Sequence, residues 1–154
     1  RKSRVRIGMV QLPAVNTPQF DWVLSRLPRR PQPVPPIFQP ELIAKAVVRM
    51  AEHPRREMWL TERTILAILG NRVAPGYLDR RLGRSGVQSQ QTDQPADRDR
   101  PANLWKPVGG DHGAHGAFDD RARASNPLVW WTVHRPTLLA DYFHRRALRT
   151  GTSP

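Results

Sequence analysis

The sequence VRIGMVQLPAVNTP, residues 5–18, decides how the rest of the chain is interpreted. Its β-favouring and apolar residues lie too close together for a helical stripe, which predicts a short, mostly buried strand over residues 5–11. Pro13 cannot donate to a sheet ladder and therefore ends this strand. Thr17 supplies an N-cap hydroxyl for an amphipathic helix predicted over Pro18–Leu27, whose proline fits the first helical position.

This order of strand, turn and helix places the turn at the carboxyl end of a strand, where open α/β sheets bind ligands. The segment LPAVNTP, residues 12–18, resembles the Pro-Gly-x-Val/Ile-x-Thr segment of the short-chain dehydrogenase/reductase (SDR) family, which follows the sixth strand of a Rossmann sheet and lies beneath the nicotinamide. The resemblance implies binding of NAD or NADP by Pro13, by the backbone at Val15 and by the hydroxyl of Thr17. Leu12-Pro13 stands where the family has Pro-Gly, which implies a turn of different shape. A Thr17 side chain that only caps the helix is the alternative.

The next interval continues the resemblance. A proline-rich run over residues 28–36 is stiff and extended, and in the family this interval is the substrate-binding loop. Pro40 opens a predicted helix and Pro54 ends it. The buried stripe of this helix is predicted to consist of Leu42, Ile43, Ala46, Val47 and Met50. A short strand is predicted over residues 57–60. The last helix and strand of the family often form a dimer contact, so the resemblance implies a homo-oligomer contact through Glu41–Leu60.

The remaining chain divides into short helices, a linker and a tail. Thr61 is predicted as the N-cap of a helix that ends at Gly70, and another short helix is predicted over residues 75–82. Residues 85–125 are rich in Gln, Asp, Pro, Gly and Arg with few apolar anchors, which predicts a flexible, largely disordered linker. The apolar pattern of residues 126–150 predicts a kinked amphipathic helix that docks within the protein, on a partner or on a membrane surface.

The chemistry of the SDR family depends on a glycine-rich turn for the pyrophosphate and on a Tyr-x-x-x-Lys pair with a nearby serine. No Gly-x-x-x-Gly-x-Gly follows a predicted strand in this sequence. The Tyr-x-x-x-Lys pair is also absent, because Tyr77 is followed four positions later by Arg81, and Tyr142 by Arg146. No catalytic residue is therefore assigned in this chain. Residues 1–84 are identified as the carboxyl-terminal part of an SDR-like α/β domain, with two strands and several helices of a doubly wound Rossmann-type sheet, followed by an irregular tail with a terminal helix.

The resemblance thus implies the carboxyl-terminal fragment of an NAD(P)-dependent oxidoreductase that acts on a small carbonyl or alcohol substrate and is inactive alone. The sheet partners of the strand over residues 5–11 are expected from another chain or from sequence outside this one. The alternative is a basic, non-enzymatic module that binds nucleic acid or a protein partner.

The amino-acid composition excludes several classes of protein and weakens the nucleic-acid alternative. The chain of 154 residues has a net charge of +12 and contains no cysteine, which excludes a disulfide framework and a thiolate metal site. No apolar run approaches transmembrane length, so a cytoplasmic protein is expected. The basic residues are spread over pairs such as Arg29-Arg30 and Arg55-Arg56, without the sustained cluster or interleaved aromatic residues that favour nucleic-acid binding.

His112 and His115 are the nearest approach to a metal motif, because two histidines lie three residues apart. The neighbouring glycines prevent a rigid helix from presenting both rings, and no second ligand cluster accompanies them. We therefore predict a polar loop and no metal site.

Overall fold

The strand at the start of the chain is shorter than predicted, and a partner lies within the chain. In the computed structural model, which describes residues 5–134, β1 (Met9–Gln11) pairs in parallel with β5 (Glu57–Trp59). The predicted mostly buried strand over residues 5–11 is therefore wrong at its start, where residues 5–8 are exposed and irregular. Because β5 is only three residues long, a longer ladder cannot form with it. The expectation that the sheet partners of this strand come from another chain or from sequence outside this one is therefore wrong for one partner, because β5 belongs to the same chain.

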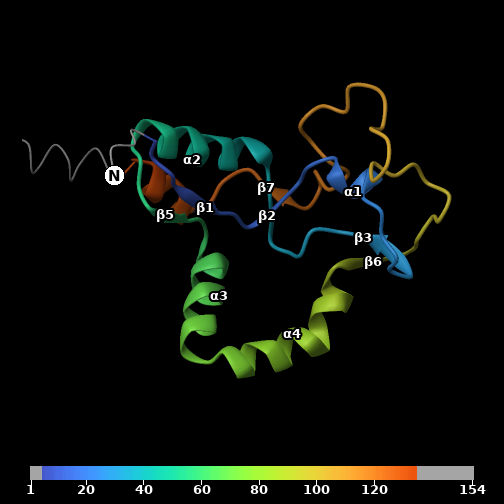
Figure 1. Ribbon diagram of the computed structural model, residues 1–154, viewed down its shortest axis with the longest axis horizontal. Coiled ribbons are helices and arrows are strands. Elements are labelled where there is room, and N and C mark those ends of the chain that lie inside the picture. Colours follow the sequence, from blue (N-terminus) through green and yellow to red (C-terminus); the bar gives the residue numbers. More distant parts are fainter. Residues whose placement is uncertain (1–4, 135–154) are drawn as a thin grey trace, which may run out of the picture.

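The other strands form two more small sheets (Figure 1). β2 (Ala14–Val15), β4 (Ile37–Phe38) and β7 (Ala122–Arg123) pair in parallel, with β4 in the centre. β3 (Arg29–Pro31), from the proline-rich run, pairs antiparallel with β6 (Gln91–Pro95). The predicted α/β class is confirmed. The described strands form three separate small sheets and do not show a single doubly wound sheet. The Rossmann-type sheet therefore stays a prediction.

Helix α2 (Pro40–Glu52) confirms the predicted helix and carries the core. A proline stands in its first turn, and Glu41 complements the positive end of the helix dipole. The core cluster consists of Phe38, Leu42, Ile43, Ala46, Met50, Met58, Leu60 and Val129. One predicted member of the buried stripe is wrong, since Val47 is 46% exposed. Each residue turns the helix by about 100°, which places Val47 beyond the edge of the arc that faces the core.

The next two helices are longer than predicted and leave the body of the molecule as an arm that returns at β6 (Figure 1). Helix α3 (Glu62–Val73) continues through Gly70, and α4 (Pro75–Ser89) continues beyond residues 75–82. A glycine within a helix costs only about 1 kcal/mol, whereas Pro75 fixes the start of a new helix. Thr61 holds the N-cap position of α3 but makes no side-chain cap, and its positive φ of 68° is unusual for a β-branched residue.

Residues 85–125 differ from the predicted disordered linker. They contain the end of α4 together with β6 and β7, and Phe118 is only 4% exposed. Their order comes from backbone pairing with β3 and β4, which leaves little apolar pattern in the sequence. Leu104 and Trp105, two of the few apolar residues in this stretch, are 54% and 89% exposed.

Residues 127–134 form a helix that docks on the core through the fully buried Val129, in agreement with docking within the protein. Asn126 caps this helix, because its Oδ1 accepts hydrogen bonds from the backbone N–H groups of Leu128 (2.9 Å) and Val129 (3.0 Å). The rest of the predicted kinked helix, residues 135–150, lies outside the described residues. None of the helices described in residues 5–134 is long and apolar enough to cross a membrane.

Candidate functional site

The three predicted cofactor residues lie in one turn, residues 13–17, which we call the elbow. The elbow begins two residues after β1 and includes β2, and the side chain of Val15 packs against the core. Pro13 and Thr17 are half-buried. The N–H of Thr17 donates to the carbonyl of Val15 (3.0 Å), and the N–H of Asn16 donates to the carbonyl of Phe38 (2.9 Å). One of these hydrogen bonds closes the turn within the elbow, and the other ties the elbow to β4.

The Thr17 hydroxyl does not cap the following helix, so the predicted N-cap is wrong. The cap residue of α1 (Gln19–Trp22) is Pro18, whose backbone is already helical at φ −62° and ψ −8°, and no side chain caps this helix. Because the helix starts one residue later than predicted, Thr17 stands too far upstream to cap it. The Thr17 hydroxyl makes no hydrogen bond within residues 5–134. This leaves the hydroxyl available to a ligand.

Helix α1 is also much shorter than the helix predicted over residues 18–27. Its backbone turns extended at Val23, with φ −64° and ψ 130°. The guanidinium of Arg100 donates to the carbonyls of Phe20 (2.8 Å) in α1 and of Val23 just beyond it. A tertiary contact therefore satisfies carbonyl groups that the short helix leaves without helical donors.

Asn16, between the two predicted cofactor contacts, is fully buried, and both polar atoms of its side chain are hydrogen-bonded. Its Nδ2 donates to Asp119 Oδ1 (2.8 Å) and to Gln39 Oε1 (3.3 Å), and its Oδ1 accepts from the N–H of Phe118 (3.1 Å). Gln39 Nε2 donates to the same Asp119 oxygen (2.9 Å). Sequence reasoning misses Asn16, because it occupies an unspecified position of the family segment and its partners lie far along the chain.

His115 joins this cluster to the start of α2. Its Nδ1 lies 3.0 Å from Asp119 Oδ1, and its Nε2 lies 2.6 Å from Glu41 Oε1. The hydrogen bond with Asp119, followed by that with Glu41, raises the pKa of His115 above its ordinary value. His115 in turn lowers the pKa of Asp119, and the backbone N–H of Glu41, followed by His115, lowers the pKa of the Glu41 carboxyl. Both ring nitrogens are therefore committed to carboxylates, and the ring cannot act as a general base in this arrangement.

Phe118 anchors the same segment beside the elbow. Its ring lies edge-on to Phe20 of α1, with 6.1 Å between centroids. The guanidinium of Arg121 lies 5.1 Å from the Phe118 ring centroid, and that of Arg30 lies 5.8 Å from it. The segment from His115 to Asp119 is thus held against the elbow by polar and aromatic contacts. We call residues 115–119 the clasp.

The two histidines considered for metal binding have separate environments. The ring of His112 packs edge-on against Trp22, with 4.4 Å between centroids, while His115 lies between the two carboxylates. The part of the chain that the structure describes holds no group of three or more His, Cys, Asp or Glu side chains that could bind a metal ion.

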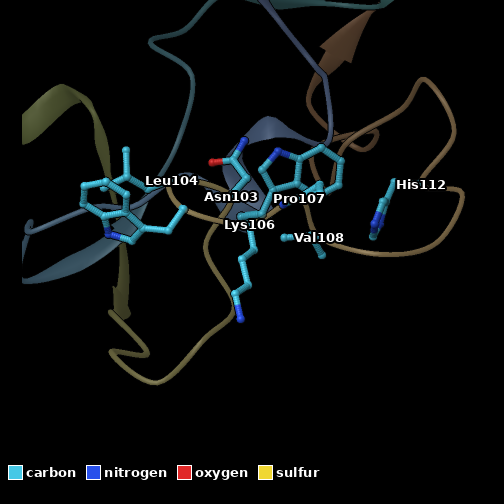
Figure 2. A pocket seen from close by; sticks show the side chains of 8 residues that line it. Asn103, Leu104, Lys106, Pro107, Val108 and His112 are labelled. Carbon is cyan, nitrogen blue, oxygen red and sulfur yellow. The ribbon is translucent and has the colours of Figure 1, made fainter.

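A hollow of about 440 Å³ lies beside α1 (Figure 2). Its walls are mainly apolar and aromatic, and Lys106 is its cation, so the hollow suits an apolar or aromatic group. The lining residues are Trp22, Asn103, Leu104, Trp105, Lys106, Pro107, Val108 and His112. Comparison of the chain with protein-family models, with curated proteins and with solved structures yields no significant match.

Proposed function

We propose that this chain is the carboxyl-terminal portion of an NAD(P)-dependent short-chain oxidoreductase, in which the elbow holds the carboxamide of the nicotinamide. The observation that carries the proposal is the parallel pairing of β1 with β5, with α2 lying between these strands in the sequence. Parallel strands need a long crossover connection, which is usually a helix. The elbow follows the carboxyl end of β1, the edge at which open α/β sheets bind ligands.

The state of Thr17 supports the same proposal. A hydroxyl that is half-buried and makes no hydrogen bond within residues 5–134 fits the amide group of a nicotinamide, which has both donors and an acceptor. Pro13 and Val15 would shape the turn beneath the ring. When bound, NAD or NADP would supply or accept the hydride.

The sequence contains no Tyr-x-x-x-Lys pair and no Gly-x-x-x-Gly-x-Gly motif, so we assign proton transfer and pyrophosphate binding to other parts of a complete enzyme. The substrate class we propose is a small carbonyl compound or alcohol, and this chain alone is inactive. We also propose a contact between two copies through Glu41–Leu60. Val47 and Val48 support it, because these apolar residues of α2 are 46% and 57% exposed.

The first experiment is to read the codons upstream of Arg1 in the gene. The proposal expects an in-frame Tyr-x-x-x-Lys motif within a few dozen codons. A start codon with no such motif would contradict the proposal and favour an independent interaction module.

The second experiment measures cofactor affinity in the complete enzyme by calorimetric titration with NADH and NADPH. Thr17→Val should raise the Kd roughly 2- to 12-fold, because one neutral hydrogen bond contributes about 0.5–1.5 kcal/mol. Thr17→Ser keeps the hydroxyl and should bind like the wild type. Both variants should have the same midpoint of urea unfolding as the wild type, because Thr17 caps no helix. Unchanged affinity in a folded Thr17→Val variant would remove Thr17 from the site.

A further inference from the structure

A continuous chain of hydrogen bonds runs from α2 to the elbow through the clasp. Glu41 Oε1 lies 2.6 Å from His115 Nε2, His115 Nδ1 lies 3.0 Å from Asp119 Oδ1, and Asp119 Oδ1 accepts from Asn16 Nδ2 at 2.8 Å. Asn16, at the end of this series of hydrogen bonds, stands between Val15 and Thr17, the two proposed nicotinamide contacts.

The clasp also touches the elbow through its backbone. The N–H of Gly116 donates to the Asn16 carbonyl (3.3 Å), and the N–H of Phe118 donates to Asn16 Oδ1 (3.1 Å). A Cβ atom at position 116 would lie 2.7 Å from the Thr17 carbonyl carbon, which is closer than folded proteins allow. Any movement of the clasp therefore changes the surroundings of both Asn16 and Thr17.

The two contacts of His115 need two ring protons. An imidazolium donates from both nitrogens, whereas a neutral imidazole has one donor and one acceptor. A neutral ring would place a nitrogen lone pair against the lone pairs of a carboxylate, at either the Glu41 or the Asp119 contact. One contact must then lengthen, which breaks the path through His115 and leaves the hydrogen bonds of Gln39 to Asn16 and Asp119 as the side-chain link between the start of α2 and the elbow.

We propose that His115 is a positioning residue for the elbow: as an imidazolium it ties the clasp to α2, and when it loses its proton one of its two ties lengthens, the clasp shifts, and the surroundings of Asn16 and Thr17 change with it. Among the described residues, the charged groups that face the His115 ring are Glu41 from α2 and Asp119 from the clasp itself. β2 and β4 place the neutral side chains of Asn16 and Gln39 beside the cluster.

The direction of the pH effect follows from the hydrogen bonds. The pKa of His115 is raised, so its contribution is complete below the ordinary histidine pKa of about 6.5 and is lost as pH rises through the raised value. The pKa values of Glu41 and Asp119 are lowered, so their contributions are complete above the ordinary carboxyl range and are lost as pH falls through the lowered values. The clasp is therefore tightest in mildly acidic solution.

The first experiment uses the 154-residue chain itself and does not depend on a cofactor. Backbone amide shifts of Asn16, Thr17 and Phe118 are followed by NMR from about pH 5 to about pH 8, together with the ring protons of His115. The amides should shift with the same midpoint as the His115 ring. Amide shifts that stay constant while the ring titrates would overturn the proposal.

Three variants distinguish the effect of the clasp from general effects of pH. His115→Gln should abolish the titration of the Thr17 amide, and the matched variant His112→Gln, in the same glycine-rich segment, should leave it unchanged. Glu41→Gln removes one facing carboxylate and should lower the midpoint measured at Thr17. An unaltered Thr17 titration in folded His115→Gln would refute the proposal. If that variant does not fold, the midpoint shift in Glu41→Gln decides the same question, and an unaltered midpoint refutes it.

The consequence for cofactor binding rests on the proposed function and is tested separately. In the complete enzyme, the Kd for NADPH or NADH should rise about fivefold or more as pH passes the His115 midpoint, and should not change over that range in His115→Gln. Absence of cofactor binding at every pH would contradict the proposed function and leave the NMR result standing. Binding that does not vary across the midpoint would overturn the coupling.

Discussion

Asn16 Nδ2 lies 2.8 Å from Asp119 Oδ1, so one hydrogen bond joins two residues that are 103 positions apart in the sequence. The Asn16 side chain is fully buried, and its carboxamide bridges the elbow, the start of α2 and the clasp. A buried amide with all of these bonds formed fixes the path of three segments at once, because leaving any of these groups unpaired is costly.

Asn16→Ala should lower the free energy of unfolding by about 1–3 kcal/mol, because the buried N–H of Phe118 loses its acceptor. Asn71→Ala is the matched control, since Asn71 is exposed on α3, and it should change the free energy by less than about 0.5 kcal/mol. Urea unfolding followed by circular dichroism measures both. Equal effects of the two substitutions would show that the bridge contributes nothing.

Gly116→Ala should destabilise the chain by about 1–3 kcal/mol, because its Cβ would meet the Thr17 backbone and Asn16 Oδ1 at 2.8 Å. Gly109→Ala is the control in the same part of the chain, since no atom lies within 4 Å of its Cβ. Hydrogen exchange of the clasp amides should accelerate only in Gly116→Ala. Slow exchange in that variant would mean that the segment accommodates a side chain.

Phe38→Ala should cost about 3–5 kcal/mol, because Phe38 is fully buried between β2, β7 and the core face of α2. Trp105→Ala removes a larger ring that is 89% exposed, and it should change the free energy of unfolding by less than about 0.5 kcal/mol. Thermal unfolding distinguishes the two. A larger loss in Trp105→Ala would contradict the position of the core.

Asn126→Ala should lower the free energy of unfolding by about 1 kcal/mol, because the first N–H groups of the helix over residues 127–134 lose their cap. Asn126→Asp should retain most of that stability, since aspartate caps helices as well as asparagine does. Chemical denaturation of both variants measures the difference. A loss in Asn126→Asp equal to that in Asn126→Ala would instead point to the hydrogen bond from Asn126 Nδ2 to Glu62 Oε2.

The purified chain of 154 residues should neither oxidise nor reduce a carbonyl or alcohol substrate with NAD(P), because its sequence contains no Tyr-x-x-x-Lys pair. The measurement is absorbance of the reduced cofactor over a panel of small ketones, aldehydes and alcohols. Reproducible turnover that co-purifies with the chain through two orthogonal columns would contradict the absence of catalytic residues.

The sequence by itself determined the elements whose signals are local. The repeat of apolar residues between Pro40 and Pro54 specified α2, with four of the five predicted stripe residues buried. A short run of β-favouring and apolar residues after Pro54 specified β5. Prolines at the first helical positions of α2 and α4 marked the starts of both helices. These signals reside in a few neighbouring residues and do not depend on the path of the chain.

Only the tertiary structure decided the polar centre and the ends of several elements. Asn16, Gln39, His115 and Asp119 carry no periodic pattern, and their partners lie up to 103 residues away, so hydrogen bonds unite them only after β2, β4 and β7 pair. Arg100, far along the chain from α1, binds the carbonyls of Phe20 and Val23 at the end of that short helix. β6 forms because β3 supplies backbone partners to a stretch with few apolar residues. Hydrogen bonds between distant segments depend on where the backbone brings them together, which the local sequence does not encode.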